Sequence, residues 1–299
     1  MSEHSFSQSI AVVVPARNEE ARIAECIRSI RTAGDIAHAA LELVVVDDAS
    51  DDQTGALASA LDATVLRQSA RHGPLAAWLR GSSATSSPVV FFVDADCLVE
   101  AAAFRNMLKH FESGTVGIVA ARSLPIQSES RSAQSLVERS AHFSAILLDA
   151  LKSRLTNHDF LPIGRLMAVR RSALHILRTD RAPCDRALAQ WAKQQGWQIV
   201  YERQAIVRYQ PISTYAQLSA DMLRSHARNA LPLAVDPLPP LTVATSLLAA
   251  LAAEPTQALA WVLCHAPFWI ARTASRDSNR QHPHVIWDVP PQEPERRSQ

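Results

Sequence analysis

The chain has 299 residues, which is enough for one large α/β domain or two small ones. Its formal net charge is +1, so the composition argues against a surface built to bind nucleic acid. The cysteines form no C-x-x-C pair, and no Gly-rich fingerprint of a dinucleotide site or a P-loop occurs. The polar N-terminus lacks the basic-then-apolar order of a secretory signal, and we expect a cytoplasmic protein.

Strand-like and helix-like segments alternate in the first half of the chain. Apolar runs predict strands at 10–15, 41–46, 64–66, 89–93 and 116–120. Between them, apolar residues at helical spacing predict helices at 18–32, 53–61, 74–85 and 101–112. This alternation, with right-handed crossovers, specifies an α/β fold with a mostly parallel sheet and helices on both faces.

The second half is less regular. We expect helices at 132–155, 185–195 and 214–229, and strands at 166–169, 197–201 and 205–207. Two apolar stretches follow, 241–253 and 258–270, and neither reaches the roughly 20 residues that a membrane span needs. They form either a helical pair that covers the core, or a pair that lies in a bilayer interface with Trp261, Trp269 and Arg272 as anchors. The tail 275–299 is predicted to be disordered.

Two carboxylates, Asp94 and Asp96, follow the apolar run 89–93. Acids are costly at the end of a buried strand unless a partner stabilises them. One such partner is a hard divalent cation, which binds carboxylate and phosphate oxygens. Ligands of open α/β sheets also bind at this end of the strands. The alternative is that the two acids open a helix after the strand, and the tripeptide alone leaves both interpretations open.

Polar residues also follow the first two strands. The first strand ends in Val13-Val14-Pro15-Ala16-Arg17-Asn18-Glu19-Glu20, and the second in Val46-Asp47-Asp48-Ala49-Ser50-Asp51-Asp52. Together with Val93-Asp94-Ala95-Asp96, these blocks and their spacing resemble the family 2 glycosyltransferases of the GT-A fold, over residues 8–230. The resemblance implies a Rossmann-like GT-A sheet with a pocket for a nucleoside diphosphate sugar. The apolar helical pair, at 231–274, would follow it as an extension.

The resemblance implies a role for each strand end. Pro15, Arg17 and Glu19 match the segment that lines the nucleoside. Asp48 matches the acid that accepts a hydrogen bond from the uracil ring, with helix capping as its alternative. Asp94 and Asp96 match the metal and ribose contacts, with Asp96 the expected direct ligand of Mg²⁺ or Mn²⁺. The family's Gly-Lys appears as Gly73-Pro74, and Arg71 is expected to take over a base or phosphate contact.

The acceptor side departs further from the family. Its catalytic base comes from a Glu-Asp pair that opens a helix, and the matching residues here are Cys184 and Asp185. Asp185 is therefore the expected base, and its alternative is an ordinary acid at a helix N-terminus. The Gln-x-x-Arg-Trp motif of processive members is reduced to Arg228, which argues against a polysaccharide synthase. Arg228 is still expected to reach the pyrophosphate.

Together these residues predict an inverting, metal-dependent, non-processive glycosyltransferase that moves a sugar from a nucleoside diphosphate sugar to an acceptor hydroxyl. The missing family residues leave a second interpretation, a degenerate member that binds nucleotide or a partner without turnover. No sequence feature names the acceptor. If the helical pair contacts the inner face of the cell membrane, a lipid or another hydrophobic acceptor is favoured.

Overall fold

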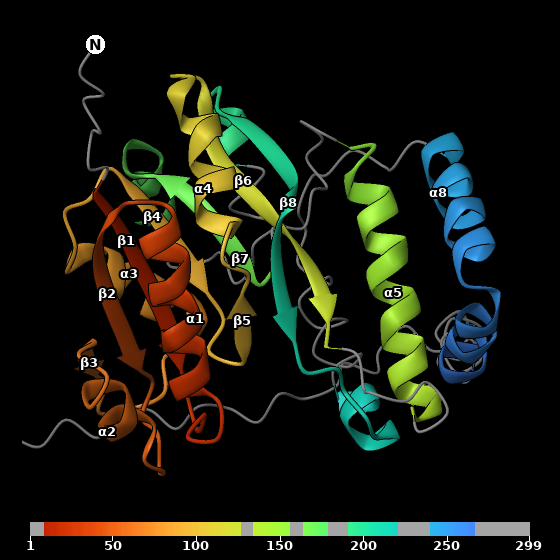
Figure 1. Ribbon diagram of the computed structural model, residues 1–299, viewed down its shortest axis with the longest axis horizontal. Helices are drawn as coiled ribbons and strands as arrows, with labels where there is room; N and C mark the ends of the chain where they lie inside the picture. The colour runs from red at the N-terminus through yellow and green to blue at the C-terminus, as the bar shows by residue number, and fades with distance from the viewer. Residues whose placement is uncertain (1–8, 127–133, 156–163, 179–190, 221–239, 267–299) are drawn as a thin grey trace, which may run out of the picture.

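One mixed sheet runs through the part of the chain that the structure describes (Figure 1). The structure is a computed structural model, and it describes residues 9–126, 134–155, 164–178, 191–220 and 240–266. Within these residues the sheet has eight strands, in the order β3-β2-β1-β4-β7-β6-β8-β5. The strands are β1 (Ser9–Ala16), β2 (Ala40–Asp47), β3 (Thr64–Arg67), β4 (Val89–Val93), β5 (Cys97–Val99), β6 (Val116–Pro125), β7 (Leu166–Arg170) and β8 (Gln198–Tyr209).

The first half of the sheet is parallel, as predicted, because a helix connects each pair of successive strands. These helices are α1 (Ile23–Ile36), α2 (Thr54–Ser59) and α3 (Pro74–Ser83). Side chains of β4 alternate between two cores: Phe91 packs on the face of α1, and Val90 and Phe92 pack on the face of α3. Both faces of the strand are therefore buried, which explains its unbroken apolar run.

The register of the central strands brings their C-terminal ends to one edge. Ala16 at the end of β1 lies opposite Asp47 at the end of β2, and Val13 lies opposite Phe92 of β4. The residues that follow β1, β2 and β4 consequently share one end of the sheet. In open α/β sheets this end is where ligands bind.

The loop after β1 is longer than predicted, and α1 begins at Ile23 rather than near Asn18. Asn18 has a φ of 54°, outside the helical region. Its side-chain oxygen accepts a hydrogen bond from the backbone N–H of Asp51, 2.9 Å away, instead of capping α1. The prediction failed because a contact with a distant loop replaced the local one.

The second half of the sheet contains two strands, β7 and β5, that run antiparallel to their neighbours. β7 lies antiparallel between β4 and β6, and β5 lies antiparallel to β8 at the edge. The two strands expected at 197–201 and 205–207 are one strand, β8, which pairs in parallel with β6. Ala121 of β6 pairs with Glu202, and the next residue, Arg122, pairs with Ile206. Residues 203–205 therefore form a bulge, and the strand continues past its polar middle. The short β5 was not predicted.

Helices cover both faces of the sheet, and a further helical layer lies beyond β6 and β8 (Figure 1). The helix after β5 is α4 (Ala103–Leu108), which a 3₁₀ turn continues to Glu112. α5 (Leu136–Lys152) begins at a capping box formed by Ser135 and Glu138. After β7 and β8 comes α8 (Pro240–Ala253), which packs against α5 around Phe143 and Ala250.

The predicted C-terminal helical pair is present, as α8 and a second helix, Pro255–Ala266. In the described part of the chain, neither helix alone is long and apolar enough to cross a membrane. The two pass that test only when joined, and a bend of 118° separates their axes. The predicted tail at 275–299 lies outside the described residues.

Gly81 on α3 provides a test of the packing that positions the cavity wall. A methyl group there would lie 2.3 Å from Cγ1 of Val13, so Gly81→Ala overpacks the contact between α3 and β1. Overpacking costs about 1–3 kcal/mol, and the helix propensity of alanine returns at most about 1 kcal/mol. We expect urea denaturation to show a lower free energy of unfolding for Gly81→Ala. Gly114→Ala is the control, since an added Cβ meets nothing within 4 Å there; equal stability of both variants would contradict this packing.

Candidate active site

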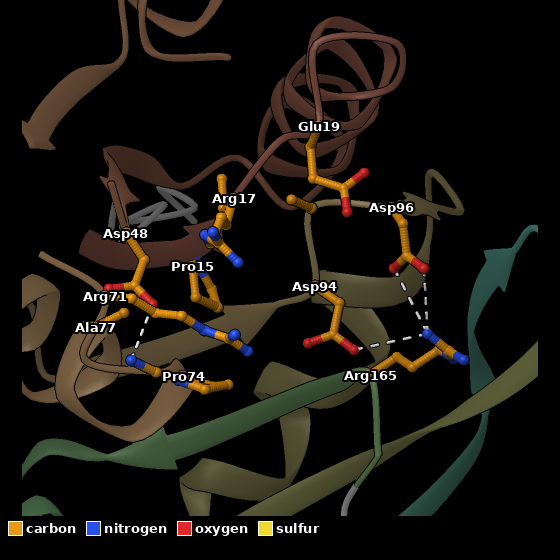
Figure 2. A pocket seen from close by; sticks show the side chains of 13 residues that line it. Pro15, Arg17, Glu19, Asp48, Arg71, Pro74, Ala77, Asp94, Asp96 and Arg165 are labelled. Carbon is orange, nitrogen blue, oxygen red and sulfur yellow. Dashed lines mark hydrogen bonds and ion pairs between the residues drawn. The ribbon is translucent and has the colours of Figure 1, made fainter. Parts of the chain in front are cut away.

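The ends of β1, β2 and β4 surround a cavity of about 450 Å³ (Figure 2). The sequence-predicted residues that line it are Pro15, Arg17, Glu19, Asp48, Arg71, Asp94 and Asp96. Figure 2 shows two ends: Asp48 and Arg71 lie on one side, and the carboxylates of Glu19, Asp94 and Asp96 lie on the other. The cavity therefore has a mixed end and an acidic end.

The loop that carries Arg17 and Glu19 is held by the loop after β2. The backbone N–H of Asn18 donates to Ser50 Oγ at 3.1 Å, and the N–H of Glu19 donates to Thr54 Oγ1 at 2.8 Å. The N–H of Glu20 donates to a carboxylate oxygen of Asp52 at 3.1 Å. These bonds satisfy backbone donors that have no helical partner, and they hold the loop against the segment that follows β2.

Asp48 is a buried acid that organises a third loop. Its two carboxylate oxygens accept from the backbone N–H groups of His72 and Gly73, at 2.7 and 2.8 Å. It does not cap a helix, since α2 begins at Thr54. The carboxylate instead draws the segment before α3 to the end of β2, which places Arg71 in the cavity wall.

The acidic end has the oxygen donors that a hard cation takes. Ligand atoms of Asp94, Asp96 and Cys97 all lie within 4.8 Å of one another. Glu19 adds a buried Oε2 that makes no hydrogen bond within the described residues, its ion-pair partner Arg22 being 3.8 Å away. Burial raises the pKa of Glu19, and the Asp96 carboxylate raises it further. Carboxylates crowded in this way favour Mg²⁺ or Mn²⁺, and these residues fit such an ion.

Cys97 is the third member of this group, and its thiol is buried beside the two acids. Burial raises the pKa of its thiol, and the neighbouring Asp96 and Asp94 carboxylates raise it further. The protonated Sγ donates to Asp96 Oδ1 at 3.3 Å. Hard cations such as Mg²⁺ and Mn²⁺ prefer oxygen ligands to sulfur, so the two carboxylates are the better donors of this group.

Arg165 is the site residue that sequence analysis missed. Its Nη1 lies 3.4 Å from an oxygen of Asp96 and 3.8 Å from one of Asp94, and its guanidinium stacks on the Tyr209 ring at 4.0 Å. Burial lowers the pKa of Arg165, but the two carboxylates outweigh it and the net shift is upward. The residue is placed by β7, whose antiparallel pairing lets the Asp94 N–H donate to the Arg165 carbonyl at 3.0 Å.

Two predicted site residues cannot be placed. Asp185, the expected base, and Arg228, the expected pyrophosphate contact, both lie outside the described residues. The same holds for Trp269 and Arg272, two of the three expected membrane anchors. Their roles stay predictions.

A comparison with known protein families matches the part of the chain that forms the donor cavity. The family model described as "Glycosyl transferase family 2" matches residues 11–177, which is more than half of the chain. The chain belongs to glycosyl transferase family 2. This confirms the resemblance seen in the three strand-end blocks.

Among curated relatives, the 4,4'-diaponeurosporenoate glycosyltransferase of Staphylococcus haemolyticus is 33% identical to this chain over 100 residues. The match covers 31% of this chain and 26% of that protein, so the chain matches only about a quarter of its relative's length.

Solved structures confirm the GT-A-like fold. A mannosyltransferase from Pyrobaculum calidifontis, in complex with GDP-Man and Mn²⁺, matches with a TM-score of 0.58 at 20% identity. That match covers 93% of this chain and 82% of the other. Glucosyl-3-phosphoglycerate synthase from Mycobacterium tuberculosis, with Mn²⁺, UDP and glucosyl-3-phosphoglycerate, matches with a TM-score of 0.55 at 22% identity. This second match covers 77% of this chain and 82% of the synthase chain.

Within this member of glycosyl transferase family 2, Arg165 provides a test of the acidic end. Its positive charge opposes a cation at Asp94 and Asp96, so Arg165→Met removes a repulsion worth about 1 kcal/mol or more in this partly buried setting. We expect calorimetry to show Mn²⁺ binding the nucleotide-free protein about fivefold more tightly. Arg80→Met, which removes an exposed charge outside the cavity lining, is the control. Weaker Mn²⁺ binding by Arg165→Met would show that the guanidinium mainly holds the carboxylates in position.

Proposed function

We propose that the chain is a metal-assisted, inverting and non-processive glycosyltransferase, which moves a sugar from a nucleoside diphosphate sugar to an acceptor hydroxyl. The observation that carries the proposal is the cavity itself, in which three separate strand ends place hydrogen-bonding groups at one end and carboxylates at the other. Family membership and the Mn²⁺-bound relatives support the same reading.

The two ends of the cavity suit the two parts of the donor. The loops of Pro15, Arg17 and Asp48 would hold the nucleoside, and Arg71 offers a planar donor fork to its base or phosphate. The diphosphate would then extend toward Asp94 and Asp96. A divalent cation bound there supplies Lewis-acid stabilisation of the departing pyrophosphate. Arg165, whose guanidinium already faces both carboxylates, would donate to the same phosphate oxygens.

The acceptor needs a base that takes the proton of its attacking hydroxyl, and we assign this role to Asp185. The support comes from the sequence, where Asp185 matches the aspartate of the family's Glu-Asp pair. Direct attack on the anomeric carbon, opposite the departing diphosphate, gives inversion. The non-processive assignment rests on Arg228 being all that is kept of the Gln-x-x-Arg-Trp motif.

Donor binding by calorimetry tests the proposal. We expect UDP- or GDP-sugars to bind wild-type protein in the presence of Mn²⁺, and Asp96→Ala to weaken this binding at least tenfold by removing a metal-binding carboxylate. Asp35→Ala, which removes an exposed carboxylate far from the cavity lining, should bind like wild type. If no common donor binds the wild type, the enzyme proposal fails.

Turnover separates an active enzyme from a degenerate member that only binds nucleotide. A competent donor site usually transfers some sugar to water, and the loss of its base should suppress this reaction. We expect mass spectrometry to detect slow donor hydrolysis by the wild type and a drop of at least tenfold in Asp185→Asn. Donor binding without any hydrolysis or transfer would instead favour the non-catalytic member, which the cysteine at position 184 motivates.

We further propose that the protein works at the inner face of the cell membrane, held there by its C-terminal helical pair. Seven large apolar side chains of the pair are exposed, among them Leu248 at 65% and Leu259 at 61%. Between residues 240 and 266 the only Asp, Glu, Lys or Arg is Glu254. An exposed, nearly uncharged apolar surface suits the hydrocarbon boundary of a bilayer better than water.

Vesicle flotation tests this contact. Replacing Leu248 and Leu259 by glutamate removes two exposed apolar anchors, each worth about 1.5–3 kcal/mol when buried. We expect binding to vesicles of phosphatidylethanolamine and phosphatidylglycerol to fall at least tenfold. Ile36→Glu, at an exposed apolar residue on α1, is the control. Equal binding of the double variant and the wild type would exclude the helical pair as the anchor.

A further inference from the structure

A second cavity, of about 610 Å³, begins where the donor cavity ends. Asp96 and Arg165 line both cavities, so their ion pair forms the partition between them. From this partition the second cavity extends along α5 and the end of β8 to the C-terminal helix that carries His265. Its volume lies in the usual range of ligand sites.

On the side of the second cavity, contacts with neighbouring elements hold Arg165 and the adjoining wall in place. The guanidinium of Arg165 stacks on Tyr209, the last residue of β8, and Tyr209 also lines this cavity. The loop that follows β8 is held by Gln217, whose Oε1 accepts from the N–H groups of Ser213 and Thr214 at 3.1 and 3.2 Å. The Oγ of Ser135, at the start of α5, donates to the Ser213 carbonyl at 3.0 Å. Strand, loop and helix thus form one connected wall.

The second cavity is lined mainly by neutral hydrogen-bonding groups. Hydroxyls come from Ser140, Ser144 and Ser213, and carboxamides come from Gln210 and Gln217. Its two arginines already face carboxylates: Arg165 faces Asp96, and Arg22 lies 3.8 Å from Glu19. Burial lowers the pKa of His265, which disfavours its charged form. The lining consequently favours a neutral, hydroxyl-bearing ligand over an anion.

We propose that this second cavity binds the acceptor, and that the part of the acceptor it holds is a neutral polyol. The inference rests on the proposed function, because it uses the donor position in the first cavity. A hydroxyl in the second cavity beside the Asp96–Arg165 partition would adjoin the acidic end, where the sugar–phosphate bond must break. The C-terminal helical pair is then part of the acceptor site, since its second helix supplies His265 to the wall.

The same helix also relates the acceptor site to the proposed membrane surface. Its inner side packs on α5, where Trp261 meets Phe143 with ring centroids 5.6 Å apart. Its outer side exposes Leu259, Val262 and Leu263. An acceptor with a polyol end in the cavity and an apolar end in the bilayer would span only the width of this helix.

Filling the second cavity tests the proposal without knowledge of the natural acceptor. Methyl β-D-glucoside is the neutral polyol probe, and glucose 6-phosphate is the anionic one. We expect saturation-transfer NMR on the full chain with UDP and Mn²⁺ to show binding of the glucoside. Ser144→Trp places an indole into the cavity from α5 and should weaken that binding at least fivefold. Leu148→Trp adds the same group one turn further along α5, at an exposed residue outside the cavity lining, and should leave the binding unchanged.

A second cavity-filling variant and a separate measurement of nucleotide binding distinguish failure of the acceptor assignment from failure of the proposed function. Gln210→Trp fills the cavity from the exposed end of β8, where folding is less at risk, and should act like Ser144→Trp. Calorimetric binding of UDP or GDP with Mn²⁺, whichever the wild type binds, should be unchanged in all three variants. If wild type binds neither UDP nor GDP, the proposed function fails. If nucleotide binds but the glucoside does not, or binds every variant equally, the acceptor assignment is wrong. Binding of glucose 6-phosphate alone would overturn the neutral class.

Discussion

The parallel register of β2, β1 and β4 determines where every acid of the donor cavity lies. The strands are apolar and buried as they approach their C-terminal ends, so the acids of the cavity follow those ends, and the register puts the ends at one edge. Acids gathered there need partners. Asp48 finds two backbone N–H groups of the third loop, and Asp94 and Asp96 find Arg165. The acidic end is therefore organised before any donor binds.

The Asp96–Arg165 ion pair links the two halves of the molecule. Asp96 follows the parallel half of the sheet, whereas Arg165 precedes β7 and stacks on the end of β8. The pair faces the donor cavity on one side and the second cavity on the other. A charge change at the donor side, such as a bound cation or diphosphate, would thus be felt directly at the wall of the second cavity.

Local patterns predicted much of the fold because they record burial. The run Val89–Val93 and the helix at 74–83 were placed to within two residues, since apolar runs and helical spacing reflect which faces are covered. The errors came where a distant partner overrides a local preference. Asn18 bonds to the loop after β2 instead of starting α1, and β8 crosses its polar centre because β6 pairs with it on both sides of a bulge.

By itself the sequence determined the family and the donor-side acids. Each acid directly follows an apolar strand along the chain, so a local pattern is enough to find it. Only the tertiary structure decided that Arg165 faces Asp96, since that contact joins residues 69 positions apart through the antiparallel pairing of β7 with β4. The second cavity has the same origin. Its walls come from the residue before α1, from α5, from the end of β8 with the segment that follows it, and from the last described helix. Side chains from such distant segments share no spacing that a linear pattern can reveal.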